Sequence, residues 1–152
     1  LSLHIILYWH QELFAGTKPA FAGKVRTHQV WISGSRFTPP SPVEVYPMLR
    51  EFFRWYDRAK KSLHPVELAA AAHLRFVTVH PFYDGNGRVS RLLMNFVLKK
   101  NGCPLLNIPY GDRNSYYNAL ERSQAKDTDR VFIQWLLRRY LKAYSVYVKP
   151  RR

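Results

Sequence analysis

The sequence predicts a mainly α-helical domain with one small β-hairpin. Most of the chain carries apolar residues at the three- and four-residue spacing of buried helix faces, and Gly, Pro and Asn-Gly stops separate these segments. One stretch differs. Residues 23–40 are rich in β-branched and aromatic residues, and the cluster Ser33-Gly34-Ser35 divides them. We therefore expect a hairpin at about residues 23–40 and mainly helix elsewhere.

Length and composition fit a single domain. The chain has 152 residues, of which 47% are hydrophobic and 15% aromatic, and this is enough apolar material for a buried core. No linker or repeat divides it, so residues 1–152 are expected to form one domain. The chain begins with Leu1 rather than Met, and we expect it to be a fragment of a longer protein. No apolar run approaches the roughly 20 residues that span a bilayer, so no membrane partner is expected.

The expected helices have recognisable starts and stops. Ser41 and Glu44 form a capping-box pattern, although Pro47 is expected to kink the helix that follows. Asn101-Gly102 supplies a left-handed stop, and Thr128 is a suitable N-cap for the last helix. The expected helices run from 3 to 14, from 42 or 47 to about 60, from 66 to 79, from 88 to 100, from about 114, and onward from 128.

The charge balance leaves several partners open. Lys and Arg number 24 against 10 Asp and Glu, and this net charge of +14 attracts ATP, nucleic acid or an acidic protein surface. The basic residues form no dense tract, only pairs such as Lys99-Lys100, so the same charge is also typical of a solvated surface. The single cysteine, Cys103, excludes an internal disulfide and makes a cytoplasmic location the expectation.

The most informative stretch is HPFYDGNGRVSR, residues 80–91. Proline and the Asp-Gly and Asn-Gly pairs end one helix, and a second helix resumes at Arg88. A helix N-terminus favours an anion, because its N–H groups are unpaired and the helix dipole is positive there. Gly85 and Gly87 lack the side chains that would keep a phosphate away from the backbone. The stretch therefore predicts a phosphate site.

Charged and polar side chains surround this predicted site. Arg88 and Arg91 are three positions apart, hence on one helix face, where both are able to reach a bound anion. Asp84 places a carboxylate at the mouth of the loop, where it suits magnesium beside phosphates. His80 ends the preceding helix, where a neutral imidazole is able to accept a proton from an attacking hydroxyl. Each residue alone is also typical of ordinary structure, but together they indicate phosphoryl or nucleotidyl transfer.

These residues resemble the motif of the Fic family, HxFx(D/E)GNGRxxR, at every specified position. The segments LHPVELAAAAHLRFVTV, SRLLMNFVL, IPYGDRNSYYNAL and VRTHQVWI are similar to eukaryotic-type Fic proteins, so the resemblance covers most of the chain. It implies a Fic-type helical bundle with residues 23–40 as a flap. It also implies an adenylyltransferase, an enzyme that moves AMP from ATP to a Ser, Thr or Tyr hydroxyl of a target protein and releases pyrophosphate.

The resemblance assigns a role in this reaction to each motif residue. His80 would deprotonate the target hydroxyl, and Asp84 would hold Mg²⁺. The residues that would bind the phosphates of ATP are Gly85, Asn86, Gly87, Arg88 and Arg91. The expected chemistry is positioning combined with charge neutralisation.

Further roles fall outside the motif. Tyr116 and Tyr117 match an aromatic pair of the family's adenine pocket, and Gln124 stands where similar proteins carry an asparagine that contacts the nucleotide. Val30 and Ile32 in the flap would clamp an extended segment of the target protein that is added to the flap edge. Core packing is an equally good account of Val30 and Ile32, and nearly as good for either tyrosine.

Other readings stay open beside adenylyl transfer. The family's inhibitory helix, with the pattern (S/T)xxxE(G/N), has no match in the sequence, so any such helix is expected upstream of Leu1 or in a separate antitoxin. In the second reading the fold is the same but the donor differs, so that the chain would transfer UMP, phosphate or phosphocholine. The intact Gly-Asn-Gly run argues against phosphate. The third reading is a basic nucleic-acid-binding or scaffold module, but no added DNA-binding domain fits within this length. The sequence also lacks HExxH and paired cysteines, the zinc patterns.

Overall fold

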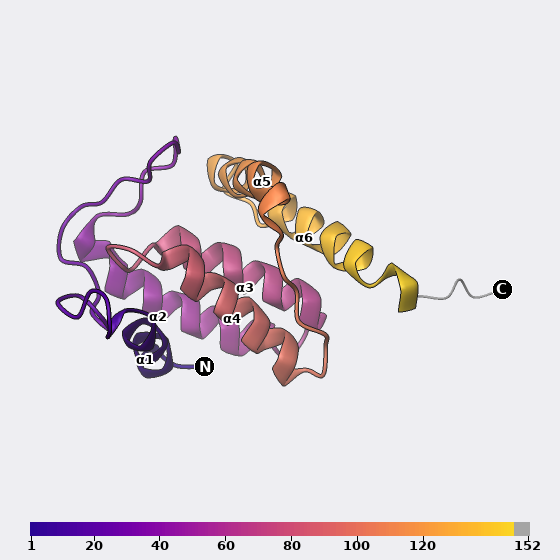
Figure 1. The fold of residues 1–152 in the computed structure, drawn as a ribbon, viewed down its shortest axis with the longest axis horizontal. Helices are drawn as coiled ribbons and strands as arrows, with labels where there is room; N and C mark the ends of the chain where they lie inside the picture. The colour runs from indigo at the N-terminus through magenta and orange to yellow at the C-terminus, as the bar shows by residue number, and fades with distance from the viewer. Residues whose placement is uncertain (148–152) are drawn as a thin grey trace.

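The computed structural model of the chain describes residues 1–147, which form six α-helices and two short 3₁₀-helices (Figure 1). In chain order these are α1 (Leu3–Phe14), α2 (Pro42–Ala59), α3 (Pro65–Val79), α4 (Asn86–Lys100), η1 (Tyr110–Asp112), α5 (Arg113–Ala125), α6 (Arg130–Ala143) and η2 (Ser145–Tyr147). The mainly helical fold that the sequence predicts is therefore confirmed. Within residues 1–147, no helix combines the length and the apolar character needed to cross a membrane.

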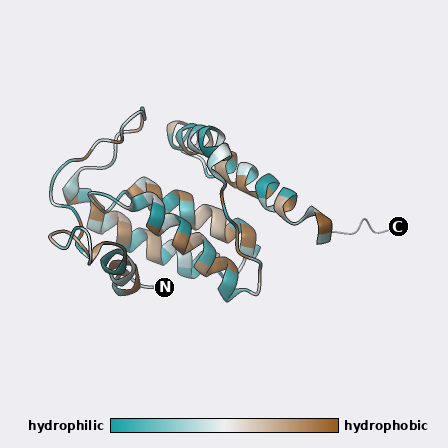
Figure 2. Ribbon diagram, viewed as in Figure 1, coloured by the Kyte–Doolittle hydropathy of each residue, from teal (hydrophilic) through white to brown (hydrophobic). Residues whose placement is uncertain are grey.

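Helix α3 is the central element of the bundle. It packs against α2, α4 and α6, while α1 contacts α4 (Figure 1). Ala69, Ala70 and Ala72 on α3 are fully buried, and their small side chains let the neighbouring helices approach closely. Figure 2 shows hydrophobic residues along α3, whereas α5 is largely hydrophilic. The core lies around α3 and takes buried residues from all six α-helices, and the α3–α4 junction that carries the motif is anchored on it.

The helix boundaries agree closely with those predicted, with three local differences. Helix α2 begins at Pro42, where the Glu44 carboxylate accepts a 2.8 Å hydrogen bond from Ser41 N–H, and it continues through Pro47. Helix α4 begins two residues before Arg88, because Gly85 takes a left-handed conformation and forms its N-cap. The N-cap of α6 is Asp129 rather than Thr128.

The predicted β-hairpin at residues 23–40 is not confirmed, since residues 1–147 contain no β-strand. The segment is an irregular loop in which side chains take the place of a strand ladder. The Gln29 amide donates a 2.9 Å hydrogen bond to Pro39 O, and Arg26 donates to Pro40 O. Pro39 and Pro40 have no N–H to offer a facing strand, which explains why backbone pairing does not form here. We call residues 23–40 the flap loop.

Candidate active site

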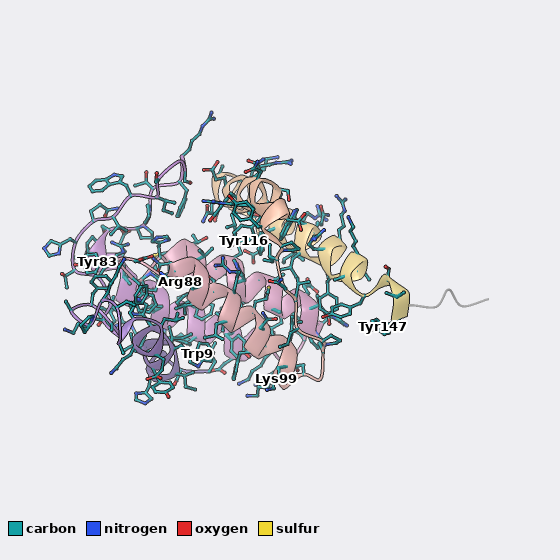
Figure 3. All side chains as sticks on the ribbon, viewed as in Figure 1. Trp9, Tyr83, Arg88, Lys99, Tyr116 and Tyr147 are labelled. Atoms are coloured by element: carbon teal, nitrogen blue, oxygen red, sulfur yellow. The ribbon has the colours of Figure 1, made fainter. Side chains whose placement is uncertain are left out.

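A pocket of about 990 Å³ lies over the N-terminus of α4. Residues 31–35 at the tip of the flap loop form one wall, residues 83–87 form the floor, and the opposite wall comes from η1 and α5. Figure 3 shows Tyr83 and Arg88 near the base of the flap loop and Tyr116 beneath α5. The pocket therefore brings together segments from three separate parts of the chain.

His80 lines this pocket as the C-cap of α3. Its backbone is left-handed, with φ 51° and ψ 56°, a conformation that non-glycine residues adopt rarely. The ring atom Nδ1 lies 3.2 Å from Val77 O, and a carbonyl oxygen only accepts, so Nδ1 donates. In the neutral ring, Nε2 is then left as the proton acceptor. Burial lowers the pKa of His80 from 6.5 to about 4, so the ring is neutral at pH 7.

The first turn of α4 presents backbone donors to the pocket. Its first backbone hydrogen bond runs from Val89 N–H to Gly85 O at 2.9 Å. The N–H groups of Asn86, Gly87 and Arg88 precede that bond and therefore have no partner within the helix. Asn86 and Gly87 line the pocket. This arrangement supports the predicted anion site, because unpaired N–H groups meet the positive end of the helix dipole there.

Each motif glycine has a structural role besides the approach of a phosphate to the backbone that the sequence suggests. Gly85 has φ 84°, and a Cβ built on it would lie 2.5 Å from the Phe14 ring on α1. A Cβ on Gly87 would lie 3.3 Å from an Arg91 guanidinium nitrogen. Gly85 is thus required for its conformation and for the packing of the loop on α1, while Gly87 leaves room for Arg91.

Asn86 holds the motif loop closed with its side chain. Its Oδ1 accepts a 2.9 Å hydrogen bond from Phe82 N–H, and its Nδ2 donates to Phe82 O at 2.8 Å. Asn86 is 3% exposed, so both bonds are shielded from water. Its amide side chain is therefore committed to the loop, and the group that it presents toward an anion is its backbone N–H.

The side chains of the two motif arginines lie in different places, although both residues belong to α4. Arg91 lines the pocket and lies beside the hydroxyl of Tyr116. The Arg88 guanidinium instead lies over the Phe14 ring, 4.4 Å from its centroid, and donates to Asp84 at 3.2 Å. In this conformation Arg91 is the arginine that faces the pocket.

Asp84 is a suitable ligand for one cation at the mouth of the pocket. Its carboxylate is about half exposed and already attracts two cations, Lys18 at 2.9 Å and Arg88 at 3.2 Å. These contacts lower the pKa of Asp84, the Lys18 hydrogen bond most, so the group is ionised at pH 7. Residues 1–147 hold no cluster of three metal-binding side chains. One carboxylate fits Mg²⁺ whose other ligands are nucleotide phosphates and water.

The residues predicted to hold adenine differ in their exposure. Tyr116 is 3% exposed, and its hydroxyl lies 3.1 Å from His73 Nε2 inside the core. Tyr117 is 47% exposed on the pocket side and lies close to Arg113. Gln124 lines the pocket and donates a 3.1 Å hydrogen bond to Thr78 Oγ1. Of these two tyrosines, Tyr117 is therefore the one that is exposed at the pocket.

The flap loop is tied to α5 at its tip. Glu121 Oε1 accepts hydrogen bonds from Ser35 Oγ at 2.6 Å and from Arg36 N–H at 2.9 Å. Ile32 lines the pocket, and Val30 is half-buried and lies outside its lining. Trp31, between them, is 77% exposed at the pocket edge. The structure thus brings Ile32, but not Val30, to the same pocket as His80.

Sequence reasoning missed His10, which supports the motif loop from α1. Its ring stacks on Phe82 with centroids 3.8 Å apart, and Nε2 lies 3.1 Å from Asp84 O. Nδ1 accepts a 2.9 Å hydrogen bond from Gly23 N–H, so Nε2 is the atom that donates to Asp84. No local pattern marks this residue, since a single histidine on a helix face is usually structural. The missed Lys18 likewise contacts the motif loop only through the fold, at Asp84.

The chain is similar in sequence to curated protein adenylyltransferases. It is 37% identical over 137 residues to protein adenylyltransferase fic-1 of Caenorhabditis elegans, a match that covers 90% of this chain and 26% of that protein. It is 38% identical to protein adenylyltransferase Fic of Drosophila yakuba, with 90% and 27% covered. The chain therefore spans about a quarter of the length of these curated relatives.

Solved structures and a family model agree with these matches. The structure of Fic-1 from Caenorhabditis elegans superposes with a TM-score of 0.84 at 33% identity, over 97% of this chain and 43% of that one. A Fic domain-containing signaling protein from Bacteroides thetaiotaomicron gives a TM-score of 0.82 at 28% identity, over 96% of this chain and 61% of that one. The model of the Fic/DOC family matches residues 1–98, which include the whole motif. The chain belongs to the Fic/DOC family.

Proposed function

We propose that this chain is a catalytic domain that transfers AMP from ATP to a Ser, Thr or Tyr hydroxyl of a target protein. The observation that carries the proposal is that the free Nε2 side of His80 shares one pocket with the N–H groups of α4 and with Arg91. The curated relatives are named protein adenylyltransferases, which supports the same reaction. A proton acceptor beside an anion cradle is what nucleotidyl transfer to a hydroxyl needs.

In the proposed reaction, the target hydroxyl oxygen attacks the α-phosphorus of ATP. The bond from that phosphorus to the oxygen bridging the α- and β-phosphates breaks, and pyrophosphate leaves. Nε2 of His80 takes the hydroxyl proton. The N–H groups of Asn86 and Gly87 and the Arg91 guanidinium neutralise the phosphate charge. Asp84 would hold Mg²⁺, which when bound neutralises phosphate charge; Lys18 would then have to give up its contact with Asp84.

Three further groups are proposed to bind the nucleotide and the target. Tyr117 would stack on the adenine ring, with Gln124 near its edge and Tyr116 holding Arg91 in place. The target would dock as an extended segment along the flap loop, where Val30, Trp31 and Ile32 N–H have no hydrogen-bond partner among residues 1–147. Unpaired backbone groups are what an added strand needs.

The inhibitory helix is proposed to act on Arg91 from outside the described residues. Arg91 forms no ion pair with any carboxylate in residues 1–147, so its charge is available to a nucleotide phosphate or to an incoming glutamate. An acidic residue supplied by an upstream segment or by a separate protein would compete with ATP at this point. We therefore expect the chain to be less restrained than a protein that carries such a segment.

A panel of labelled donors tests the reaction. The chain is incubated with Mg²⁺ and a cell extract as the source of targets, in parallel with α-labelled ATP, γ-labelled ATP, α-labelled UTP and labelled CDP-choline. Protein-bound label from α-labelled ATP alone is the expected result. Label from the γ-phosphate would indicate phosphate transfer, and label from UTP or CDP-choline would indicate another donor. Calorimetric titration with ATP and Mg²⁺ checks binding, and no binding would overturn the proposal.

A further inference from the structure

Arg26 is a buried arginine at the start of the flap loop. Its side chain is 2% exposed, and its guanidinium donates three hydrogen bonds, all to backbone carbonyl oxygens. Nε donates to His80 O at 2.7 Å, and the two terminal nitrogens donate to His28 O at 3.0 Å and to Pro40 O at 2.5 Å. Arg26 N–H also donates to Pro81 O at 2.9 Å.

These acceptors belong to the two parts of the molecule that the proposed reaction must bring together. His28 and Pro40 flank the stretch of the flap loop proposed to receive the target, while His80 and Pro81 open the motif loop. One side chain therefore joins both ends of the flap loop to the carbonyl of the proposed base. The planar guanidinium has five N–H donors in a fixed fork, so it is able to bond all three acceptors at once. The flexible ammonium of a lysine has no such geometry.

The arrangement costs free energy in two places. Arg26 has no carboxylate partner among residues 1–147, and a buried cation without a counter-charge is unfavourable. His80 adopts a left-handed backbone, which is unfavourable at a non-glycine residue and persists only when its surroundings hold it. Arg26 supplies that hold, because its Nε–H bonds the carbonyl of the strained residue itself.

We propose that Arg26 is a positioning residue that couples the flap loop to His80, so that a docked target hydroxyl and the Nε2 acceptor are held in register. Only the expected changes in transfer rate rest on the proposed function. The coupling through the hydrogen bonds of Arg26 does not. Displacing the flap loop would move the His28 and Pro40 carbonyls, and through the shared guanidinium it would disturb the backbone of His80. A segment that docks in the correct place would keep this set of bonds intact.

The charge of Arg26 supports the same role. Burial is the larger cause of the low pKa of His80, and the positive charge of Arg26 lowers it further. Four other charged side chains line the pocket with His80, namely Asp84, Arg91, Arg113 and Glu121. Arg26 is buried and does not line the pocket. It therefore favours the neutral, proton-accepting ring whether or not a substrate is bound.

The test compares Arg26→Lys and Arg26→Gln with Arg50→Lys, a change at an exposed arginine on α2. Rates of label transfer from α-labelled ATP are measured against pH, at a temperature where circular dichroism shows each variant folded. Arg26→Lys keeps the charge and loses the fork, so we expect kcat to fall about 10²-fold while KM for ATP stays unchanged. Arg26→Gln also loses the positive charge that lowers the pKa of His80. The acid side of its rate–pH profile should therefore move to higher pH as well. Arg50→Lys should match the parent chain.

A wild-type kcat in Arg26→Lys would overturn the inference. A rise in KM for ATP at unchanged kcat would do the same, since it would place Arg26 in nucleotide binding. If the parent chain transfers no AMP, the proposed function fails, but the coupling is still measurable. NMR of the parent chain should show an Arg26 Nε–H proton protected from solvent exchange. A solvent-averaged Nε–H signal would rule out the bond to His80 O without relying on the folding of any variant.

Discussion

The ammonium group of Lys18 lies 2.9 Å from Oδ2 of Asp84, the carboxylate proposed to hold Mg²⁺. Both side chains are about half exposed, so the ion pair contributes at most about 1 kcal/mol. If Asp84 holds Mg²⁺ as proposed, Lys18 would compete with the metal ion for this carboxylate. The loop between α1 and the flap loop would then carry a cation that opposes metal binding.

Replacing Lys18 with glutamine is expected to lower the Mg²⁺ concentration that gives half-maximal activity. An ion pair worth about 1 kcal/mol corresponds to a change of about fivefold. The measurement is a Mg²⁺ titration of AMP transfer at fixed ATP, with Lys61→Gln, an exposed lysine after α2, as the matched control. An unchanged or higher Mg²⁺ requirement in Lys18→Gln would show that Lys18 does not compete at this site.

Buried histidines predict a loss of stability in mild acid. Burial lowers the pKa of His73 from 6.5 to about 3 and that of His80 to about 4. Between pH 6.5 and those values the unfolded chain binds more protons than the folded chain. The free energy of unfolding should therefore be at its full value above pH 6.5 and decrease as the pH falls toward 4. Urea denaturation at several pH values measures this slope.

The variant His73→Gln should flatten that slope, because glutamine keeps a hydrogen-bonding group near the Tyr116 hydroxyl but does not titrate. His4→Gln, at an exposed position of α1, should leave the slope unchanged. Equal slopes in His73→Gln and the parent chain would contradict the assignment of the acid sensitivity to His73.

Two glycines with left-handed backbones give a matched comparison of strain and space. Gly85→Ala adds a Cβ only 2.5 Å from the Phe14 ring, whereas Gly102→Ala, at φ 70°, meets nothing within 4 Å. In both variants an alanine has to adopt a left-handed backbone, which lowers the free energy of unfolding by about 1 kcal/mol. Gly85→Ala should lose at least a further 1–3 kcal/mol through steric overlap on α1. Thermal unfolding of both variants measures the difference, and equal losses would mean that the contact with Phe14 yields freely.

Glu121 is expected to hold the tip of the flap loop against α5. Glu121→Ala removes the acceptor of two hydrogen bonds, from Ser35 Oγ and Arg36 N–H, so amide exchange at residues 31–36 should become faster by about an order of magnitude. Exchange in α3 should stay unchanged. Protection of the tip at the parent level would show that packing, rather than Glu121, fixes the loop.

Much of this architecture was predictable because its signals are local. Helical periodicity and stop residues placed the helices, and α1 runs over the predicted residues. The turn at Asp84-Gly85 was also visible, since glycine supplies the left-handed N-cap. The contacts that complete the site were not predictable in this way. His10, Lys18 and Arg26 lie 54 or more positions from their partners in the motif loop, so only the fold brings them there.

The hairpin predicted for the flap loop is not confirmed, for a related reason. Its β-forming residues are consistent with an extended backbone, but the pairing partners turned out to be side chains, such as the Gln29 amide on Pro39 O. Residue preference reports local conformation and does not specify which groups satisfy the hydrogen bonds. Likewise, the shared helix face of Arg88 and Arg91 was evident from their spacing, whereas the packing of Arg88 on Phe14 depends on α1.

Label transfer by His80→Ala tests the central claim most directly. The parent chain, His80→Ala and His4→Ala are incubated with Mg²⁺, α-labelled ATP and the same cell extract, and ATP binding is checked by calorimetry in each. Because Nε2 of His80 is the proposed proton acceptor, label on protein should appear with the parent chain and with His4→Ala, and fall at least about 10²-fold in His80→Ala while ATP still binds. Transfer by His80→Ala at the parent rate would contradict the assignment of His80 as the base.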